Sequence, residues 1–145
     1  MERSEIKLLE RMERAEREKM LDLAYEAMKQ AYVPYSHFQV GACLKGANGT
    51  YYLGCNIENA SYTPTNCAER TAVFKAVSEG EREFTAIAIV CSGKSPAAPC
   101  GVCRQVLREF CKDDMPVVFA NADRVVIETT LGDLLPHSFG PEDLL

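Results

Sequence analysis

The pattern of apolar and polar positions in residues 1–32 predicts an N-terminal helix, in one piece or in two. From Met20 onward the apolar residues recur at helical spacing and share one face, which we expect to pack on a core. Residues 10–19 are instead a run of mixed charge. We expect this run to be a solvated helix face, within a charged helical extension over residues 1–19. Pro34 ends the helix, because a proline ring does not fit a helix interior.

Two strands joined by a hairpin follow the helix. In residues 38–44 apolar side chains alternate with polar or small ones, which is typical of a strand with one face on the core. Phe38 opens this strand. Asn48 and Gly49 are the strongest short signal for a two-residue hairpin turn, so residues 50–55 are the returning strand.

The rest of the pattern alternates helices with strands. After a loop at residues 56–66 it predicts a helix from 67 to about 80, a buried strand at 84–91, a helix from 100 to about 112, strands at 116–120 and 125–129, and a helical turn at 131–135. Strands joined through a helix run parallel, whereas the first hairpin is antiparallel. The 145 residues therefore predict one α/β domain, in which a five-stranded mixed sheet has helices on both faces.

Composition and charge exclude several classes of function. The formal net charge is −5, without the Lys and Arg clusters of a polynucleotide-binding surface. The longest buried-looking apolar run, residues 84–91, is far too short to cross a bilayer. The first residues are charged and no apolar signal sequence follows them. Seven cysteines, an odd number, argue against a disulfide framework. We therefore expect a cytoplasmic protein without nucleic-acid or membrane partners.

Three of the seven cysteines stand in two short blocks at predicted helix starts. Cys67 begins the block Cys-Ala-Glu-Arg, and Cys100 and Cys103 belong to the block Pro-Cys-Gly-Val-Cys. The unpaired N–H groups and the positive dipole end of a helix start favour the thiolate form of cysteine. Cys100 and Cys103 are three residues apart and so share one face of their helix.

Three thiolates without a fourth ligand are typical of a catalytic zinc site, because structural zinc sites normally have four protein ligands. The open position of a catalytic site binds water, whose pKa the zinc ion lowers to about 7. Glu69 follows Cys67 by two residues and is placed to move protons without binding the metal. The sequence therefore predicts a Zn²⁺ cofactor and one catalytic carboxylate.

The Cys-Gly-Val-Cys block alone has two other interpretations, a redox pair and half of a structural zinc site. A thioredoxin-like redox motif directly follows a strand, whereas here a Gly/Ser/Pro loop precedes it. A structural site needs a fourth ligand. The two histidines, His37 and His137, both lie in predicted turns and are more simply exposed turn residues.

These blocks, with others in the chain, resemble the small zinc-dependent cytidine deaminases. The further matches are Pro-Tyr-Ser-His-Phe at 34–38, Gly-Cys-Asn-Ile-Glu-Asn-Ala at 54–60, Leu-Leu-Pro at 134–136 and Ser-Phe-Gly-Pro-Glu-Asp-Leu at 138–144. A Glu beside the first ligand and a Pro-Cys-x-x-Cys block are the signature of zinc deaminases. The resemblance implies a three-layer α/β/α sandwich with the two cysteine-bearing helices side by side under one end of the sheet. It also implies hydrolysis of cytidine and deoxycytidine to uridine and deoxyuridine, with release of ammonia.

The resemblance also implies roles for residues near the cysteines. Arg70 would donate hydrogen bonds to ligand sulfurs and offset their charge, and a surface arginine in a helix is the less favoured alternative. Asn56 and Glu58 would bind the ribose hydroxyls, but a turn-forming pair is an equal interpretation of their spacing. Phe38 would line the pyrimidine pocket, and its place in the predicted strand also makes it a core residue. The backbone N–H of Ala68, at a helix start, is a candidate partner for the base carbonyl.

The C-terminal tail carries Phe139 in a segment rich in Pro and Gly that has neither helical nor strand period. A small domain can bury such a residue against a symmetric copy of itself. The resemblance implies a homotetramer with shared active sites. In it Phe139, and Tyr62 from the loop before Cys67, would approach the nucleoside of a neighbouring subunit.

Three other functions stay open at this point. The chain could be a deaminase of another aminopyrimidine, an editor of polynucleotides, or a catalytically silent zinc-binding module. The acidic charge argues against an editor, and the presence of Glu69 argues against a silent module.

Overall fold

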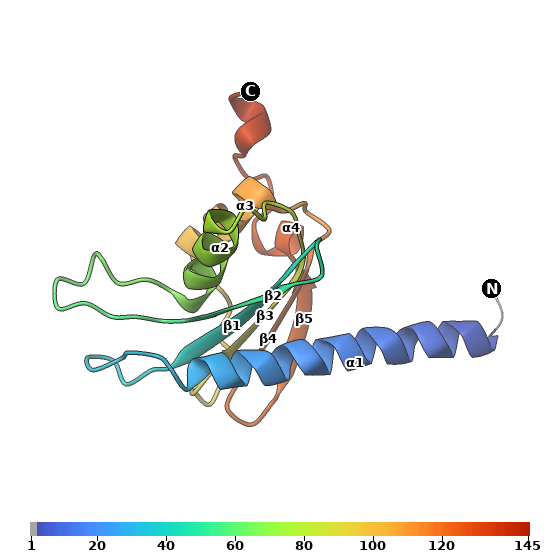
Figure 1. Cartoon of the computed structure of the whole chain (residues 1–145), viewed down its shortest axis with the longest axis horizontal. Coiled ribbons are helices and arrows are strands. Elements are labelled where there is room, and N and C mark those ends of the chain that lie inside the picture. Colours follow the sequence, from blue (N-terminus) through green and yellow to red (C-terminus); the bar gives the residue numbers. More distant parts are fainter. Residues whose placement is uncertain (1–2) are drawn as a thin grey trace.

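The computed structural model describes residues 3–145, with the surroundings of side chains from residue 13 onward (Figure 1). Residues 1 and 2 of the predicted extension, and the side chains of 3–12, lie outside this description. The helices are α1 (Arg3–Met28), α2 (Ala68–Ser78), α3 (Gly101–Phe110) and α4 (Leu131–Leu134), with a 3₁₀ turn at Pro141–Asp143. The strands are β1 (Val40–Gly46), β2 (Tyr51–Cys55), β3 (Phe84–Cys91), β4 (Pro116–Ala120) and β5 (Val126–Thr130).

The five strands form one mixed sheet in the order β2-β1-β3-β4-β5. Strands β3 and β4 pair in parallel and are joined through α3, while the other neighbours are antiparallel. The turn at Asn48 and Gly49 joins β1 to β2, and Gly49 adopts the positive φ of 85° that such turns favour. The predicted five-stranded mixed sheet and its first hairpin are confirmed.

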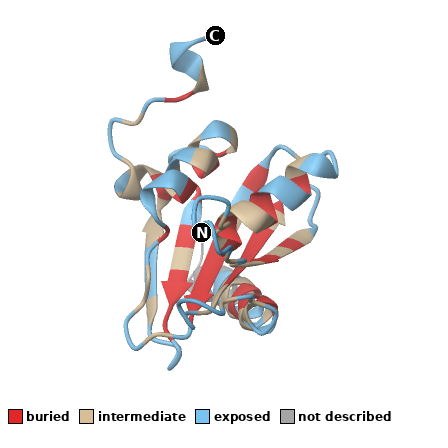
Figure 2. Cartoon of the chain, turned by 90° about the vertical axis from the view of Figure 1, so that its left-hand side faces the viewer, coloured by how far each residue is buried: buried red, intermediate tan, exposed pale blue. Residues whose placement is uncertain are grey.

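The helices cover both faces of the sheet, so the predicted α/β/α layering is confirmed (Figure 2). Helix α1 packs on one face through Met20, Leu21 and Ala24. Helices α2 and α3 pack on the other face, where their apolar residues join those of β1, β3 and β4 in the larger core. The two cysteine-bearing helices contact each other on this side, as the resemblance implies.

Strand β1 is buried on both faces, so the prediction of a single core face is wrong. Ala42 and Leu44 pack beneath α2 and α3, whereas Cys43 packs beneath α1, and all three are fully buried. The physical reason is that β1 lies inside the sheet and has a helix on each side. A Cβ atom at Gly41 would overlap the carbonyl oxygen of Ala24, so the strand and α1 meet backbone to backbone.

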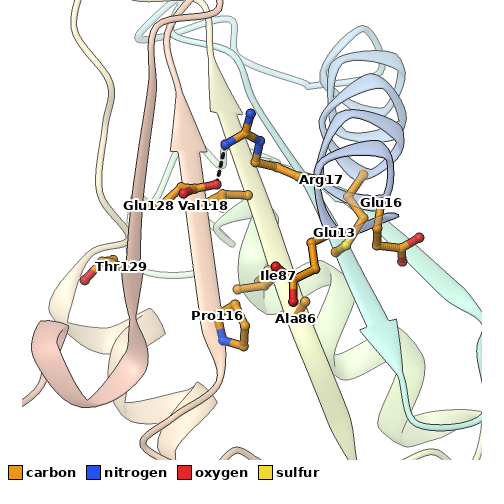
Figure 3. A pocket seen from close by; sticks show the side chains of 10 residues that line it. Glu13, Glu16, Arg17, Ala86, Ile87, Pro116, Val118, Glu128 and Thr129 are labelled. Atoms are coloured by element: carbon orange, nitrogen blue, oxygen red, sulfur yellow. Dashed lines mark hydrogen bonds and ion pairs between the residues drawn. The ribbon is translucent and has the colours of Figure 1, made fainter. Parts of the chain in front are cut away.

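Helix α1 is one continuous helix of 26 residues, and Figure 1 shows its N-terminal half reaching beyond the sheet. The predicted solvated face at 10–19 is wrong for three of its residues, Glu16, Arg17 and Glu18, which are only partly exposed. The Glu16 carboxylate lies 2.7 Å from Nζ of Lys45 on β1, and Arg17 pairs with Glu128 on β5. Beside them, a cavity of about 470 Å³ is lined by residues of α1, β3, β4 and β5 (Figure 3). None of the helices described in residues 3–145 has both the length and the apolar character of a membrane span.

Candidate metal centre

The three predicted cysteines lie at the starts of two neighbouring helices. Cys67 is the N-cap residue of α2 and Cys100 is the N-cap residue of α3, where its Sγ accepts a hydrogen bond from the Cys103 backbone N–H. Helix α2 is held in place at this end because Gly54 of β2 allows close approach: a Cβ atom there would overlap the carbonyl oxygen of Ala68. The sequence-based placement of the thiols in the first helical turns is confirmed.

The sulfur atoms converge on one point. The Sγ atoms of Cys67 and Cys100 are 3.9 Å apart, those of Cys100 and Cys103 are 3.4 Å apart, and all three lie within 4.8 Å of one another. Tetrahedral zinc with Zn–S bonds of about 2.3 Å needs sulfurs roughly 3.8 Å apart, so the donor set fits this ion. Cys103 is buried and Cys100 is exposed, so solvent reaches the cluster from the Cys100 side.

Neither histidine belongs to this cluster. Among the described residues that could hold a metal, the cluster consists of the three cysteines alone. His37 and His137 are exposed and both adopt a left-handed backbone conformation, with φ of 57° and 53°. Their prediction as exposed turn residues is therefore confirmed, and within the described part of the chain no fourth ligand joins the three cysteines.

Hydrogen bonding makes Cys67 the anionic member of the cluster. The Cys103 thiol and then the Arg70 guanidinium donate to the Cys67 sulfur and lower the pKa of Cys67 to about 5. The pKa of Cys103 is raised, first because its thiol hydrogen bonds to Cys67 and then because it is buried. A metal ligand must be deprotonated, so the surroundings favour the form of Cys67 that binds a cation.

Arg70 lies against the cluster, one helical turn after Cys67. Its Nη2 atom donates a hydrogen bond to Cys67 Sγ at 3.2 Å. Its Nε atom is buried, and no hydrogen-bond partner for it is found among the described residues. The predicted contact between this guanidinium and a ligand sulfur is therefore present, and the alternative of a simple surface arginine is wrong.

Glu69 is a buried carboxyl group in the first turn of α2. Its residue is only 4% exposed. Burial raises the pKa of Glu69, and the negative charge of Cys67 raises it further. A raised pKa brings a carboxyl closer to the pH at which it must both accept and release a proton, which suits a general acid–base group.

Asn56 and Glu58 hold the segment that leads into β1. The Asn56 amide accepts a hydrogen bond from the Val40 N–H at 2.9 Å and donates one to the Phe38 carbonyl at 2.8 Å. The Glu58 carboxylate accepts the N–H of Tyr35 at 3.0 Å. Hydrogen bonding from Ser36 lowers the pKa of Glu58. Both side chains therefore hold the backbone at residues 35–40, across 16 to 23 residues, and do not form the turn of their own that the turn-forming interpretation expects.

Three aromatic residues predicted near the substrate lie on the surface of this chain. Phe38 is 38% exposed and precedes β1, so its interpretation as a core residue is wrong. Tyr62 is 73% exposed, and its ring meets Tyr35 edge-on at a centroid distance of 6.3 Å. Phe139 is 58% exposed. The loop with Tyr62 and the tail with Phe139 both project from the body of the molecule (Figure 1).

Three polar residues of α3 have structural partners that the sequence analysis did not identify. Arg104 donates to the carbonyl oxygens of Pro99 at 2.7 Å and of Leu134 at 2.8 Å. Gln105 and Arg108 bind the C-terminal tail about 30 residues away. Hydrogen bonds between segments so distant leave no periodic signal, although the three residues lie on the helix that the Pro-Cys-x-x-Cys block begins.

Comparison with known proteins identifies the same region. The model of the cytidine and deoxycytidylate deaminase zinc-binding region matches residues 14–120. A cytidine deaminase of Sporosarcina psychrophila is 54% identical over 127 residues, which are 88% of this chain and 93% of that protein. A cytidine deaminase of Halalkalibacterium halodurans is 50% identical over 129 residues, or 89% and 98% of the two chains.

Solved structures agree with these sequence relatives. The crystal structure of cytidine deaminase from Burkholderia pseudomallei superposes with a TM-score of 0.81 at 48% identity, covering 84% of this chain and 98% of that one. The crystal structure of cytidine deaminase from Mycobacterium tuberculosis superposes with a TM-score of 0.74 at 40% identity. It covers 85% of this chain and 96% of that one. Because the matched region contains both cysteine blocks and the buried carboxyl of Glu69, we conclude that the chain belongs to the cytidine and deoxycytidylate deaminase family.

Proposed function

We propose that the protein hydrolyses free cytidine and deoxycytidine to uridine and deoxyuridine, with release of ammonia. The observation that carries this proposal is the buried Glu69 carboxyl beside three sulfurs within 4.8 Å of one another. The relatives named above, which are described as cytidine deaminases, support the same activity.

In this proposal Cys67, Cys100 and Cys103 hold the zinc ion. When bound, zinc supplies Lewis acidity and makes water nucleophilic at neutral pH. Glu69 accepts the proton that the water loses as its oxygen attacks C4 of the base. The same carboxyl then delivers protons to N3 and to the departing amino group, so that cytidine and water become uridine and ammonia. Arg70 offsets the negative charge of the sulfurs and keeps Cys67 deprotonated.

The substrate contacts are proposed from the roles that the family resemblance implies. The Ala68 N–H, at the start of α2, is assigned to the base carbonyl, and Phe38 lines the pyrimidine pocket. Asn56 and Glu58 bind the ribose hydroxyls. A carboxylate accepts several hydrogen bonds, so Glu58 can serve both the backbone at Tyr35 and a sugar hydroxyl.

We further propose a homotetramer whose active sites are shared. Exposed apolar surface supports assembly: Phe74 and Val102 of α2 and α3 are about half exposed beside a cavity of about 460 Å³. Tyr62 and Phe139 are exposed aromatic residues on projecting segments, which suits contact with a neighbour's nucleoside. We place the protein in the cytoplasm, because its seven cysteines are all free.

The test of activity is ammonia release from a panel of free nucleosides, with zinc content measured in parallel. Cytidine and deoxycytidine should be turned over, and single-stranded DNA should not. Turnover of a different aminopyrimidine in place of cytidine would overturn the substrate, and zinc-loaded protein without any turnover would favour the silent module.

The test of shared sites mixes two impaired variants at a cytidine concentration well below the KM of Phe139→Ala. Glu69→Gln lacks the proton carrier and Phe139→Ala lacks the tail aromatic, but a mixed oligomer has sites in which Glu69 and Phe139 come intact from different subunits. Activity well above the sum of the two variants is expected after exchange of subunits. Light scattering that finds a fully active monomer would remove this proposal.

A further inference from the structure

Helix α3 holds the C-terminal tail through two polar side chains that follow the metal-binding cysteines. The Gln105 side chain donates to the Phe139 carbonyl oxygen at 2.9 Å. The Nε atom of Arg108 donates to the Ser138 hydroxyl at 2.8 Å, and its Nη2 atom pairs with the Glu142 carboxylate. The Phe139 carbonyl, and the Ser138 and Glu142 side chains on either side of it, are therefore attached to α3.

The contact between Arg108 and the tail is close as well as polar. The Arg108 side chain is only 15% exposed, although it is charged. A Cβ atom at Gly140 would lie 2.5 Å from the centre of its guanidinium, so this position has no room for a side chain. The Gly140 N–H is in turn bonded to the Asp143 carboxylate at 2.8 Å. The tail thus has a defined path across Arg108.

Burial of the Phe139 ring does not explain why the C-terminal tail has a defined path. The ring residue is 58% exposed, while its neighbour Gly140 is buried. Chain ends are usually poorly ordered unless something attaches them. Charge-assisted hydrogen bonds are among the stronger attachments available. Here Arg108 makes them to the Ser138 and Glu142 side chains, Gln105 holds the Phe139 carbonyl, and the aromatic side chain stays outside.

We propose that Gln105 and Arg108 are positioning residues for the deamination: they fix residues 138–142 so that Phe139 is presented to the nucleoside of a neighbouring subunit. This inference rests on the proposed function and its shared sites. Helix α3 then performs two tasks, because its first turn supplies Cys100 and Cys103 and its later turns fix the tail. An aromatic that is already in place binds the base without the loss of affinity that a mobile tail would cause.

The first measurement is steady-state kinetics on cytidine. Phe139→Ala should raise KM about 5- to 100-fold, the range expected from loss of one base-stacking aromatic. Arg108→Gln and Gln105→Ala should raise KM about 3- to 10-fold with little change in kcat, because they reduce only the fraction of chains with a correctly placed ring. Arg124→Gln is the matched control, since Arg124 also pairs with two carboxylates but on α1, and it should leave KM unchanged.

The decisive comparison is a double-mutant cycle. If Arg108 acts through Phe139, then adding Arg108→Gln to Phe139→Ala should change KM by less than about 1.5-fold, because no ring remains to be positioned. Multiplicative effects of the two substitutions would overturn the inference. Should Arg108→Gln fail to fold, Gln105→Ala and Ser138→Ala complete the same cycle at the two neighbouring hydrogen bonds.

A second readout does not depend on activity. The chain has no tryptophan, so Phe139→Trp introduces a single fluorescent reporter at the tail. Its anisotropy should fall and its quenching by acrylamide should rise when Arg108→Gln is added, whereas Arg124→Gln should change neither. Unchanged anisotropy would overturn the inference while native turnover of cytidine still stands. Wild-type protein without turnover of cytidine would overturn the proposed function, and this inference with it.

Discussion

The Nη2 atom of Arg70 lies 3.2 Å from the sulfur of Cys67, one turn along the same helix. Three thiolates and one Zn²⁺ carry a net charge of −1, and excess negative charge weakens the Lewis acidity of the metal. A guanidinium in contact with one sulfur offsets that charge. The same contact helps to lower the pKa of Cys67 to about 5, after the hydrogen bond from Cys103.

Arg70→Gln should therefore reduce zinc affinity or kcat by about 10- to 100-fold, as is typical when a partner of a metal ligand is lost. Zinc retention against a competing chelator and kcat on cytidine measure the two effects. Arg82→Gln is the control, because Arg82 is an exposed arginine just after α2. An Arg70→Gln enzyme with native affinity and native kcat would show that the sulfur contact has no function.

Glu69→Gln should retain fold and zinc but lose about 10²- to 10⁴-fold in kcat, because the amide cannot carry the proton. The substitution preserves shape, which matters at a residue that is only 4% exposed. Glu79→Gln is the matched control, at an exposed position at the other end of α2. Turnover within a few fold of wild type would refute the assignment of Glu69 as the proton carrier.

Cys103→Ser should remove most of the bound zinc and the activity, and wild-type protein should contain one zinc ion per chain. Cys43→Ala is the control, because Cys43 is also a buried cysteine but lies on the α1 side of the sheet. Burial raises the pKa of Cys43 to about 12, so this thiol is neutral and unsuited to binding a metal. Elemental analysis measures the zinc content of both variants. Full zinc content in Cys103→Ser would exclude this residue as a ligand.

Gly41→Ala should destabilise the fold by about 1–3 kcal/mol, the cost of overpacking a filled interior. The added Cβ atom would meet backbone atoms of α1, including the Met28 nitrogen at 2.7 Å, and backbone cannot move aside as a side chain can. Gly101→Ala should cost little, because its Cβ atom would meet nothing within 4 Å. The midpoints of denaturant unfolding, measured with zinc present, compare the stabilities of Gly41→Ala and Gly101→Ala. Equal midpoints would contradict the close packing of α1 on β1.

The sequence was most informative where local pattern and chemistry coincide. Cys67, Glu69 and Cys100 were placed correctly because apolar spacing indicates where a helix begins, and a helix start decides which way its first residues face. The element order and the mixed sheet followed from the same spacing. Long-range relations were not predictable: the alternation in residues 38–44 indicated a strand with one face on the core, because nothing local reports that α1 also covers β1.

The residues predicted to bind the substrate show the same limit of prediction from sequence. Phe38 was expected at the start of a strand because it fits the alternation, but the strand begins two residues later at Val40. The Asn56 side chain accepts a hydrogen bond from the Val40 N–H, a contact between residues that are 16 positions apart in the chain. Gln105 and the Phe139 carbonyl are 34 residues apart, and such pairs can be recognised only once the chain is folded.

Cys67 and Cys100 are 33 residues apart in the chain, and β3 lies between them. An ion held by both sulfurs is a cross-link that closes this loop, and such a link removes conformational entropy from the unfolded chain rather than adding contacts to the folded one. By the relation for covalent cross-links, a loop of this length corresponds to roughly 3–4 kcal/mol. Zinc would then stabilise the central strand β3 against thermal unfolding in addition to its role in the chemistry. Removal of zinc by a chelator should therefore lower the melting temperature of an inactive Glu69→Gln protein as much as that of the active enzyme.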